Sequence, residues 1–185
     1  MALSRLEALQ SLQTNLENQN LVKHCLAAEA VLRALARRLG HDEETWGATG
    51  LLHDIDLELT DGDREAHSKL GADLARELGA SDEMCQAILR HNEAHGLPRL
   101  SPLDKALWCT DPLTGLITAA ALVQPNKKLA GVTSESLLKR YKEKRFAAGA
   151  DRQAIADCSQ VGLTLEEFLA LGLKAMQGVA GELGL

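Results

Sequence analysis

Apolar residues recur every three or four positions along most of this chain, which is the spacing of one face of an α-helix. The first twenty residues show this spacing in their leucines, and no stretch alternates apolar and polar residues as a half-buried strand does. Aromatic residues make up only 3% of the 185 residues, so leucine and alanine must fill the core. Because these two residues favour helices, the sequence predicts an all-α protein, a single-domain bundle of about eight helices.

Capping residues and helix breakers mark where these helices begin and end. Ser4 and Glu7 form a capping-box pattern at the first helix, and Thr164 and Glu167 form another at the last one. Pro112 should kink a long helix, because it removes a backbone donor. Four inner helices are predicted with clear bounds, at residues 20–39, 42–53, 65–78 and 81–92.

The chain divides into three predicted segments of one domain. Residues 1–19 form a helix that packs on the core, residues 20–122 form the core, and residues 123–185 form a C-terminal helical extension. Within that extension, residues 127–152 carry eight basic and three acidic side chains, a charge of +5, although the whole chain carries −6. The net negative charge and the few aromatic residues argue against general nucleic-acid binding.

The sequence also predicts a cytoplasmic protein that does not enter a membrane. No apolar run is long enough to span a bilayer, and the N-terminus lacks the basic start and continuous apolar stretch of a signal peptide. The four cysteines include no Cys-x-x-Cys pair, so we expect reduced and mostly buried thiols.

An adjacent His53 and Asp54 end the apolar run that begins at Gly50. An imidazole and a carboxylate at the edge of a buried segment are natural ligands for a divalent metal ion. A second pair, His41 and Asp42, has a simpler explanation as a helix N-cap followed by acidic residues. His53 and Asp54 have no such explanation, so they predict partners elsewhere in the chain.

Four other positions could join this pair. His24 lies on the apolar face of a predicted helix, where its alternative role is that of a core histidine. Asp111 interrupts an apolar helix, where a buried carboxylate requires a cation or several donors, and its alternative role is a local hydrogen bond that tolerates the kink at Pro112. His67 and His91 stand at predicted helix ends, where an exposed position or contact with the helix C-terminus would also explain them. His95 is expected to be a bystander. Such nitrogen and oxygen donors would hold one divalent ion and leave positions open for water.

Taken in order, these residues resemble the HD-domain superfamily of metal-dependent phosphohydrolases, in its HDIG-type branch of small stand-alone prokaryotic proteins. The resemblance covers residues 20–122 and implies the all-α HD fold. Four segments carry it, namely Gly50–Asp56, His67–Leu74, Ile88–Glu93 and Cys109–Ile117.

The resemblance implies four primary metal ligands, His24, His53, Asp54 and Asp111. His67 and His91 stand where two-metal members have further ligands and where one-metal members have substrate-facing histidines. Asp56 and Leu57 replace a common glycine and lysine, and Asn92 replaces a histidine of two-metal members. We therefore expect one tightly bound divalent ion (Mn, Fe, Co, Ni, Zn or Mg) and at most a weak second one.

The resemblance implies phosphohydrolase activity but no specific substrate. Our hypothesis is hydrolysis of a phosphomonoester or phosphodiester in a small molecule, with a nucleotide as the favoured substrate. The ion would activate a bound water molecule, Asp54 would orient that water, and His67 or His91 would protonate the leaving oxygen. Four basic side chains are candidate phosphate contacts, with a solvated surface as their alternative role: Arg64, Lys69, Lys127 and Lys128.

Three other interpretations remain open. The chain could be a catalytically weak module that senses a nucleotide, and its basic segment 127–152 could then dock an acidic partner. It could be a di-iron oxygenase, which Asn92 disfavours because that chemistry needs two irons. The predicted ligands could also never meet. A homodimer formed through the leucine-rich first helix is compatible with each interpretation.

Overall fold

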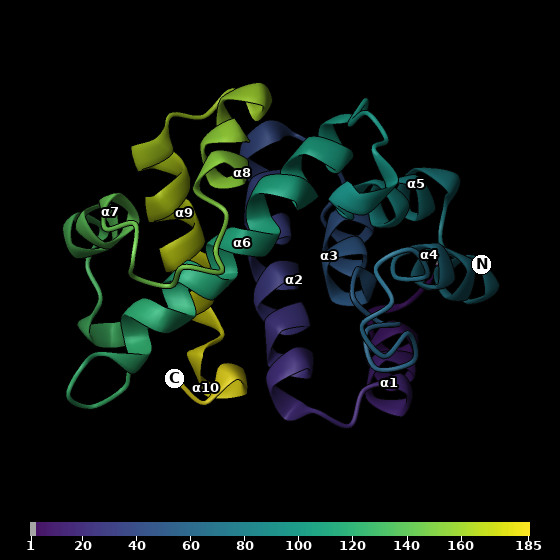
Figure 1. The fold of residues 1–185 in the computed structure, drawn as a ribbon, viewed down its shortest axis with the longest axis horizontal. Helices are drawn as coiled ribbons and strands as arrows, with labels where there is room; N and C mark the ends of the chain where they lie inside the picture. The colour runs from purple at the N-terminus through teal and green to yellow at the C-terminus, as the bar shows by residue number, and fades with distance from the viewer. Residues whose placement is uncertain (1–2) are drawn as a thin grey trace.

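The computed structural model describes residues 3–185, which form ten α-helices and three short 3₁₀-helices (Figure 1). The α-helices are α1 (Arg5–Asn15), α2 (Gln19–Leu39), α3 (Glu43–Leu52), α4 (Lys69–Glu77), α5 (Asp82–His91), α6 (Pro102–Leu122), α7 (Ser134–Lys142), α8 (Arg152–Ala156), α9 (Leu165–Gly178) and α10 (Ala180–Leu183). The 3₁₀-helices are η1 (Glu93–His95), η2 (Leu129–Gly131) and η3 (Asp157–Val161).

The all-α prediction is confirmed, with no strand among the described residues. The ten helices exceed the predicted eight because α8 and α10 have only five and four residues. The predicted capping boxes at Ser4 and Thr164 are both present. Met1 and Ala2, the first residues of the predicted segment 1–19, lie outside the described residues. The division of the chain at residues 19 and 122 stays a prediction.

The predicted start of the fourth helix is wrong, because α4 begins at Lys69 and residues 64–68 form turns. Ser68 has a φ of 67°, a left-handed conformation that an α-helix cannot contain. The Asp56 carboxylate accepts hydrogen bonds from the backbone N–H groups of Ser68 and Gly71, at 2.7 and 2.8 Å. A side chain from another segment thus satisfies the first turn of α4 and fixes where that helix begins.

The two longest helices, α2 and α6, cross in the middle of the molecule and divide it into two sides (Figure 1). On one side α7, α8 and α9 surround a larger apolar core that includes Leu32, Leu107, Leu113, Phe168 and Met176. On the other side α1, α3, α4 and α5 enclose a smaller apolar core that includes Leu12, Leu51, Ile55, Ala75 and Ile88.

α6 begins at the N-cap Ser101 with Pro102 in its first turn, and it continues as one helix through Pro112. All four cysteines are buried and free. Within residues 3–185, no helix combines the length and the apolar character needed to cross a bilayer.

Candidate metal centre

The structure brings the four predicted ligands together at the crossing of α2 and α6. His24 Nε2 lies 3.0 Å from Asp111 Oδ1 and 3.2 Å from His53 Nε2. Asp54 Oδ2 lies 3.3 Å from His53 Nε2 and 3.5 Å from His24 Nε2. The alternative in which these residues never meet is therefore wrong.

Close packing of α3 on α2 positions His53. At Gly50 a Cβ atom would lie 2.8 Å from the backbone carbonyl carbon of Ala28, so only glycine permits this contact. His53 follows as the C-cap residue of α3, one turn after Gly50, and Asp54 is in the turn that continues from it. The contact thus delivers both residues to the face of α2 that carries His24.

A hydrogen bond at Nδ1 orients each of three imidazoles. His53 Nδ1 donates to the Gly50 carbonyl at 2.8 Å, and His91 Nδ1 donates to the Ile88 carbonyl at 2.6 Å. The Thr114 hydroxyl donates to the Asp111 carbonyl at 2.8 Å, so at 2.9 Å it accepts from His24 Nδ1.

These Nδ1 protons leave a lone pair on each Nε2 atom, which is the tautomer that binds a metal ion. The Nε2 atoms of His24 and His53 face each other at 3.2 Å beside two carboxylates. Lone pairs and anions at this distance require a cation or a proton among them. The donor set therefore fits a divalent metal ion.

Asp54 joins this group to the other two histidines. Its Oδ1 atom lies 3.3 Å from His91 Nε2 and 3.6 Å from His67 Nε2, whereas its Oδ2 atom faces His24 and His53. Two sets of potential ligands result, each with atoms within 4.8 Å of one another: His24, His53 and Asp111, and His53, Asp54 and His91.

The centre is reached by solvent at Asp111 and His24. The side chain of His53 is 0% exposed and that of Asp54 is 10% exposed, whereas those of His24 and Asp111 are 23% and 38% exposed. The cluster is therefore open where α2 and α6 cross.

Electrostatics within the cluster favour charged carboxylates. The pKa of Asp54 lies well below its ordinary value, because the nearby imidazoles of His53 and His24 outweigh the effect of burial. For His24, burial opposes protonation, but hydrogen bonds that it donates to Asp111 and Asp54, together with the charge of Asp111, outweigh burial and raise the pKa to about 10. In the absence of a metal ion, protons therefore neutralise the carboxylates.

Asp56 is a site residue whose role sequence reasoning missed, since it was noted only as a replacement for glycine. Its carboxylate is fully buried and accepts from His67 Nδ1 at 2.8 Å, as well as from two backbone N–H groups of the α4 start. Burial opposes protonation of His67, but this hydrogen bond and the charges of Asp54 and Asp56 together raise its pKa. Asp56 thus holds His67 with its Nε2 atom toward Asp54. A carboxylate two residues after Asp54 was the only sequence signal for it.

Asn92 and His95 contact the backbone of the segment that carries His67. The Asn92 amide donates to the backbone carbonyls of Arg64 and His67, at 2.7 and 3.1 Å. His95 Nε2 lies 2.9 Å from the His67 carbonyl, so the expected bystander contacts the backbone that carries His67. Neither side chain belongs to the two ligand sets found among the described residues.

The four candidate phosphate contacts lie on the surface, away from the cluster's hydrogen bonds. Lys69 Nζ lies 3.7 Å from a Glu65 carboxylate, and Lys128 Nζ donates to the Gly184 carbonyl at 3.2 Å. Arg64 and Lys127 are exposed. Within residues 3–185, none of these four side chains makes a hydrogen bond or ion pair with the His and Asp cluster.

The sequence also matches a family of known proteins. The model of the HD domain family matches residues 21–151, which is more than half of the chain. No solved structure matches.

Several curated relatives are ribonucleases Y. The protein from Desulfotalea psychrophila is 30% identical over 150 residues, which cover 77% of this chain and 28% of that protein. The protein from Lawsonia intracellularis is 30% identical over 152 residues, covering 78% of this chain and 28% of the relative. The protein from Oleidesulfovibrio alaskensis is 33% identical over 98 residues, covering 53% and 18%. This chain spans less than a third of each of these relatives. With the family match across its central region and a cluster of histidines and aspartates at the centre of the fold, the chain belongs to the HD domain family.

Proposed function

We propose that this chain is a metal-dependent phosphohydrolase that cleaves a phosphomonoester or phosphodiester of a small molecule, with a nucleotide as the substrate. Membership of the HD domain family supports metal-dependent hydrolysis in general. One observation carries the proposal: the Nε2 atoms of His24 and His53 lie 3.2 Å apart, with a carboxylate oxygen of Asp111 3.0 Å from the first and one of Asp54 3.3 Å from the second.

Four residues would hold the ion: His24, His53, Asp54 and Asp111. When bound there, a divalent ion supplies a Lewis acid for a phosphoryl oxygen and lowers the pKa of water. The candidate ions are Mn, Fe, Co, Ni, Zn and Mg, which all accept these ligands.

Asp54 and His67 would act on protons. Asp54 Oδ1 faces away from His24 and His53 and toward His67 and His91, where it would accept a hydrogen bond from a water molecule and orient it. His67 can hold a proton on Nε2, because Asp56 stabilises its charged form through Nδ1. His91 lacks such a carboxylate and donates to a backbone carbonyl instead, so His67 is the better donor to the leaving oxygen. His91 is then suited to a weak second ion beside Asp54.

The alternative, a nucleotide-sensing module of low activity, is favoured by a separate observation. The candidate phosphate contacts Arg64, Lys69, Lys127 and Lys128 are exposed and make no described contact with the cluster. Substrate phosphates would then be held by the ion and the histidines alone. A homodimer and a cytoplasmic location also stay predictions.

Metal content and hydrolysis test this proposal together. Protein purified without a metal-binding tag would be analysed for its elements and then loaded with each candidate ion. Nucleoside mono-, di- and cyclic phosphates would be screened beside short RNA, because the relatives are named ribonucleases. We expect about one ion per chain and release of phosphate or nucleotide. A protein that binds a nucleotide in a thermal-shift assay without consuming it would support the sensing module instead.

A further inference from the structure

Gly115 has no explanation within the protein's own packing. It lies inside α6, where glycine is less favourable than alanine because it loses more conformational entropy on folding. A Cβ atom there would have no neighbour within 4 Å, whereas at Gly50 and Gly172 it would lie 2.8 and 2.6 Å from other atoms. The glycines at 50 and 172 therefore permit close packing, but Gly115 leaves open space.

Two pockets border this space beside His24. Both are lined by His24 and Gly115. One, of about 360 Å³, continues over Asp111 to residues 147–150. The other, of about 470 Å³, lies between α2, α6 and the segment 183–185. That segment lies outside residues 21–151, so this wall is not supplied by the part of the chain that matches the family.

The lining of the larger pocket indicates what it can bind. Its walls are aliphatic at Ala119, Leu122 and Leu183, and its polar side chains are Asn20, Thr118 and Lys23, besides His24. An amide and a hydroxyl offer both donors and acceptors, which suit the edge of a heterocycle. A polyol would leave its hydroxyls unpaired against the leucines, and an alkyl chain would leave Asn20 and Thr118 unused. The volume is in the range of small-molecule sites.

We propose that the larger pocket binds the nucleoside part of a nucleotide whose phosphate lies at His24, and that Gly115 determines this specificity by leaving room for the link between them. The inference rests on the function proposed above. It assigns a binding role to the segment 183–185 and to Lys23, which lies against Gly184.

The test replaces the open space with a side chain. In Gly115→Leu the new side chain would project into the space shared by the pockets. Gly178→Leu is the matched control, because Gly178 ends α9, is exposed and also has no atom within 4 Å of an added Cβ. Each protein, loaded with metal, would be titrated calorimetrically with the four common ribonucleoside monophosphates and with inorganic phosphate.

We expect Gly115→Leu to bind inorganic phosphate as the wild type does but to bind the preferred nucleoside monophosphate about tenfold or more weakly. Gly178→Leu should bind both as the wild type does. Equal affinity of Gly115→Leu and wild type for the nucleotide would overturn the pocket assignment and leave the hydrolase proposal standing. So would a wild type that binds every monophosphate no more tightly than phosphate. A metal-loaded wild type that binds neither probe and hydrolyses nothing would overturn both proposals.

Discussion

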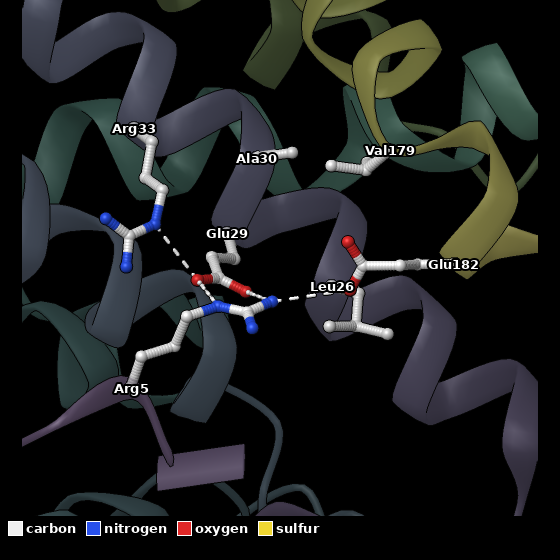
Figure 2. A pocket seen from close by; sticks show the side chains of 7 residues that line it. All are labelled: Arg5, Leu26, Glu29, Ala30, Arg33, Val179 and Glu182. Atoms are coloured by element: carbon white, nitrogen blue, oxygen red, sulfur yellow. Dashed lines mark hydrogen bonds and ion pairs between the residues drawn. The ribbon is translucent and has the colours of Figure 1, made fainter.

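Two charged clusters lie on α2 barely more than one turn apart, one at Glu29 and one at His24. Glu29 is 3% exposed, and its carboxylate accepts from Arg5 at 2.6 and 3.0 Å and from Arg33 at 2.9 Å (Figure 2). Arg33 in turn donates to both carboxylate oxygens of Glu44. In this cluster each arginine already has two carboxylate partners, since Arg5 also lies 3.4 Å from Glu182, although a pocket of about 170 Å³ adjoins it.

The cluster at His24 differs in the direction of its donors. Its imidazole protons point outward to Thr114 and to backbone carbonyls, and its lone pairs point inward at carboxylates. The Glu29 cluster therefore needs nothing from outside, whereas the His24 cluster needs a cation. Burial and charge are common to both, so the orientation of donors and acceptors is what distinguishes a ligand site from a structural ion pair.

The largest effect should follow from Asp54→Asn. The amide can no longer bridge the two sets of imidazoles as an anion, so metal content should fall from about one ion per chain to a small fraction. Hydrolysis should fall by about 10³-fold or more, while the helical circular dichroism signal stays unchanged. Full metal content in this variant would place the ion elsewhere.

Glu29→Ala should lower the stability of the protein and leave its metal content unchanged. It removes the buried carboxylate that Arg5 and Arg33 share and leaves them only the exposed Glu182 and Glu44, which should lower the free energy of unfolding by about 2 kcal/mol. Metal content per folded chain should not change. Urea denaturation measures the loss, and Glu29→Gln serves as the control that keeps the side-chain volume. A loss of metal equal to that of Asp54→Asn would remove the distinction between the two clusters.

Asp56→Asn should have an intermediate effect. The amide cannot stabilise a charged His67 as the carboxylate does, so hydrolysis should fall by about 10–100-fold with the metal retained. The alkaline limb of the pH–rate profile should also move to lower pH, because His67 would lose its proton more readily. An unchanged profile would show that His67 does not supply the proton.

Acid pH should weaken ion binding moderately. In the ion-free protein, protonated His24 contributes stability that is complete below pH 6.5 and is lost as the pH rises through about 10. An ion must displace this proton at neutral pH, so its apparent affinity should fall by about tenfold for each unit of decreasing pH. Titration of the protein with the ion at pH 6, 7 and 8 measures how its apparent affinity depends on pH. Glu29→Gln should show the same pH dependence as the wild type. A flat response would mean that no proton is displaced.

Much of the fold could be predicted from the sequence, because residues close together in the chain determine where its helices form. Helical periodicity and capping residues gave the all-α fold, and the order of the His and Asp motifs indicated which residues would meet. The start of α4 could not be predicted in this way, because the determining bonds come from Asp56, which is distant from Ser68 in sequence. The second contact of His24, with Thr114, spans ninety positions and leaves no local pattern.

The roles of Glu29 and Gly115 were hidden for a related reason. A glutamate on a helix is ordinarily exposed, and only tertiary packing places Glu29 between two arginines. Gly115 was visible as part of a motif, but only the structure shows that the space beside it is empty.

The tight contact at Gly50 also bears on how the chain folds. α2 and α3 are neighbours in sequence, so His24 and His53 can meet through a short loop, and such local contacts form early. Asp111 joins only when α6, a distant segment, packs across them. A metal ion captured by the two histidines would then favour the docking of α6, and refolding should be faster in the presence of the ion than after its removal.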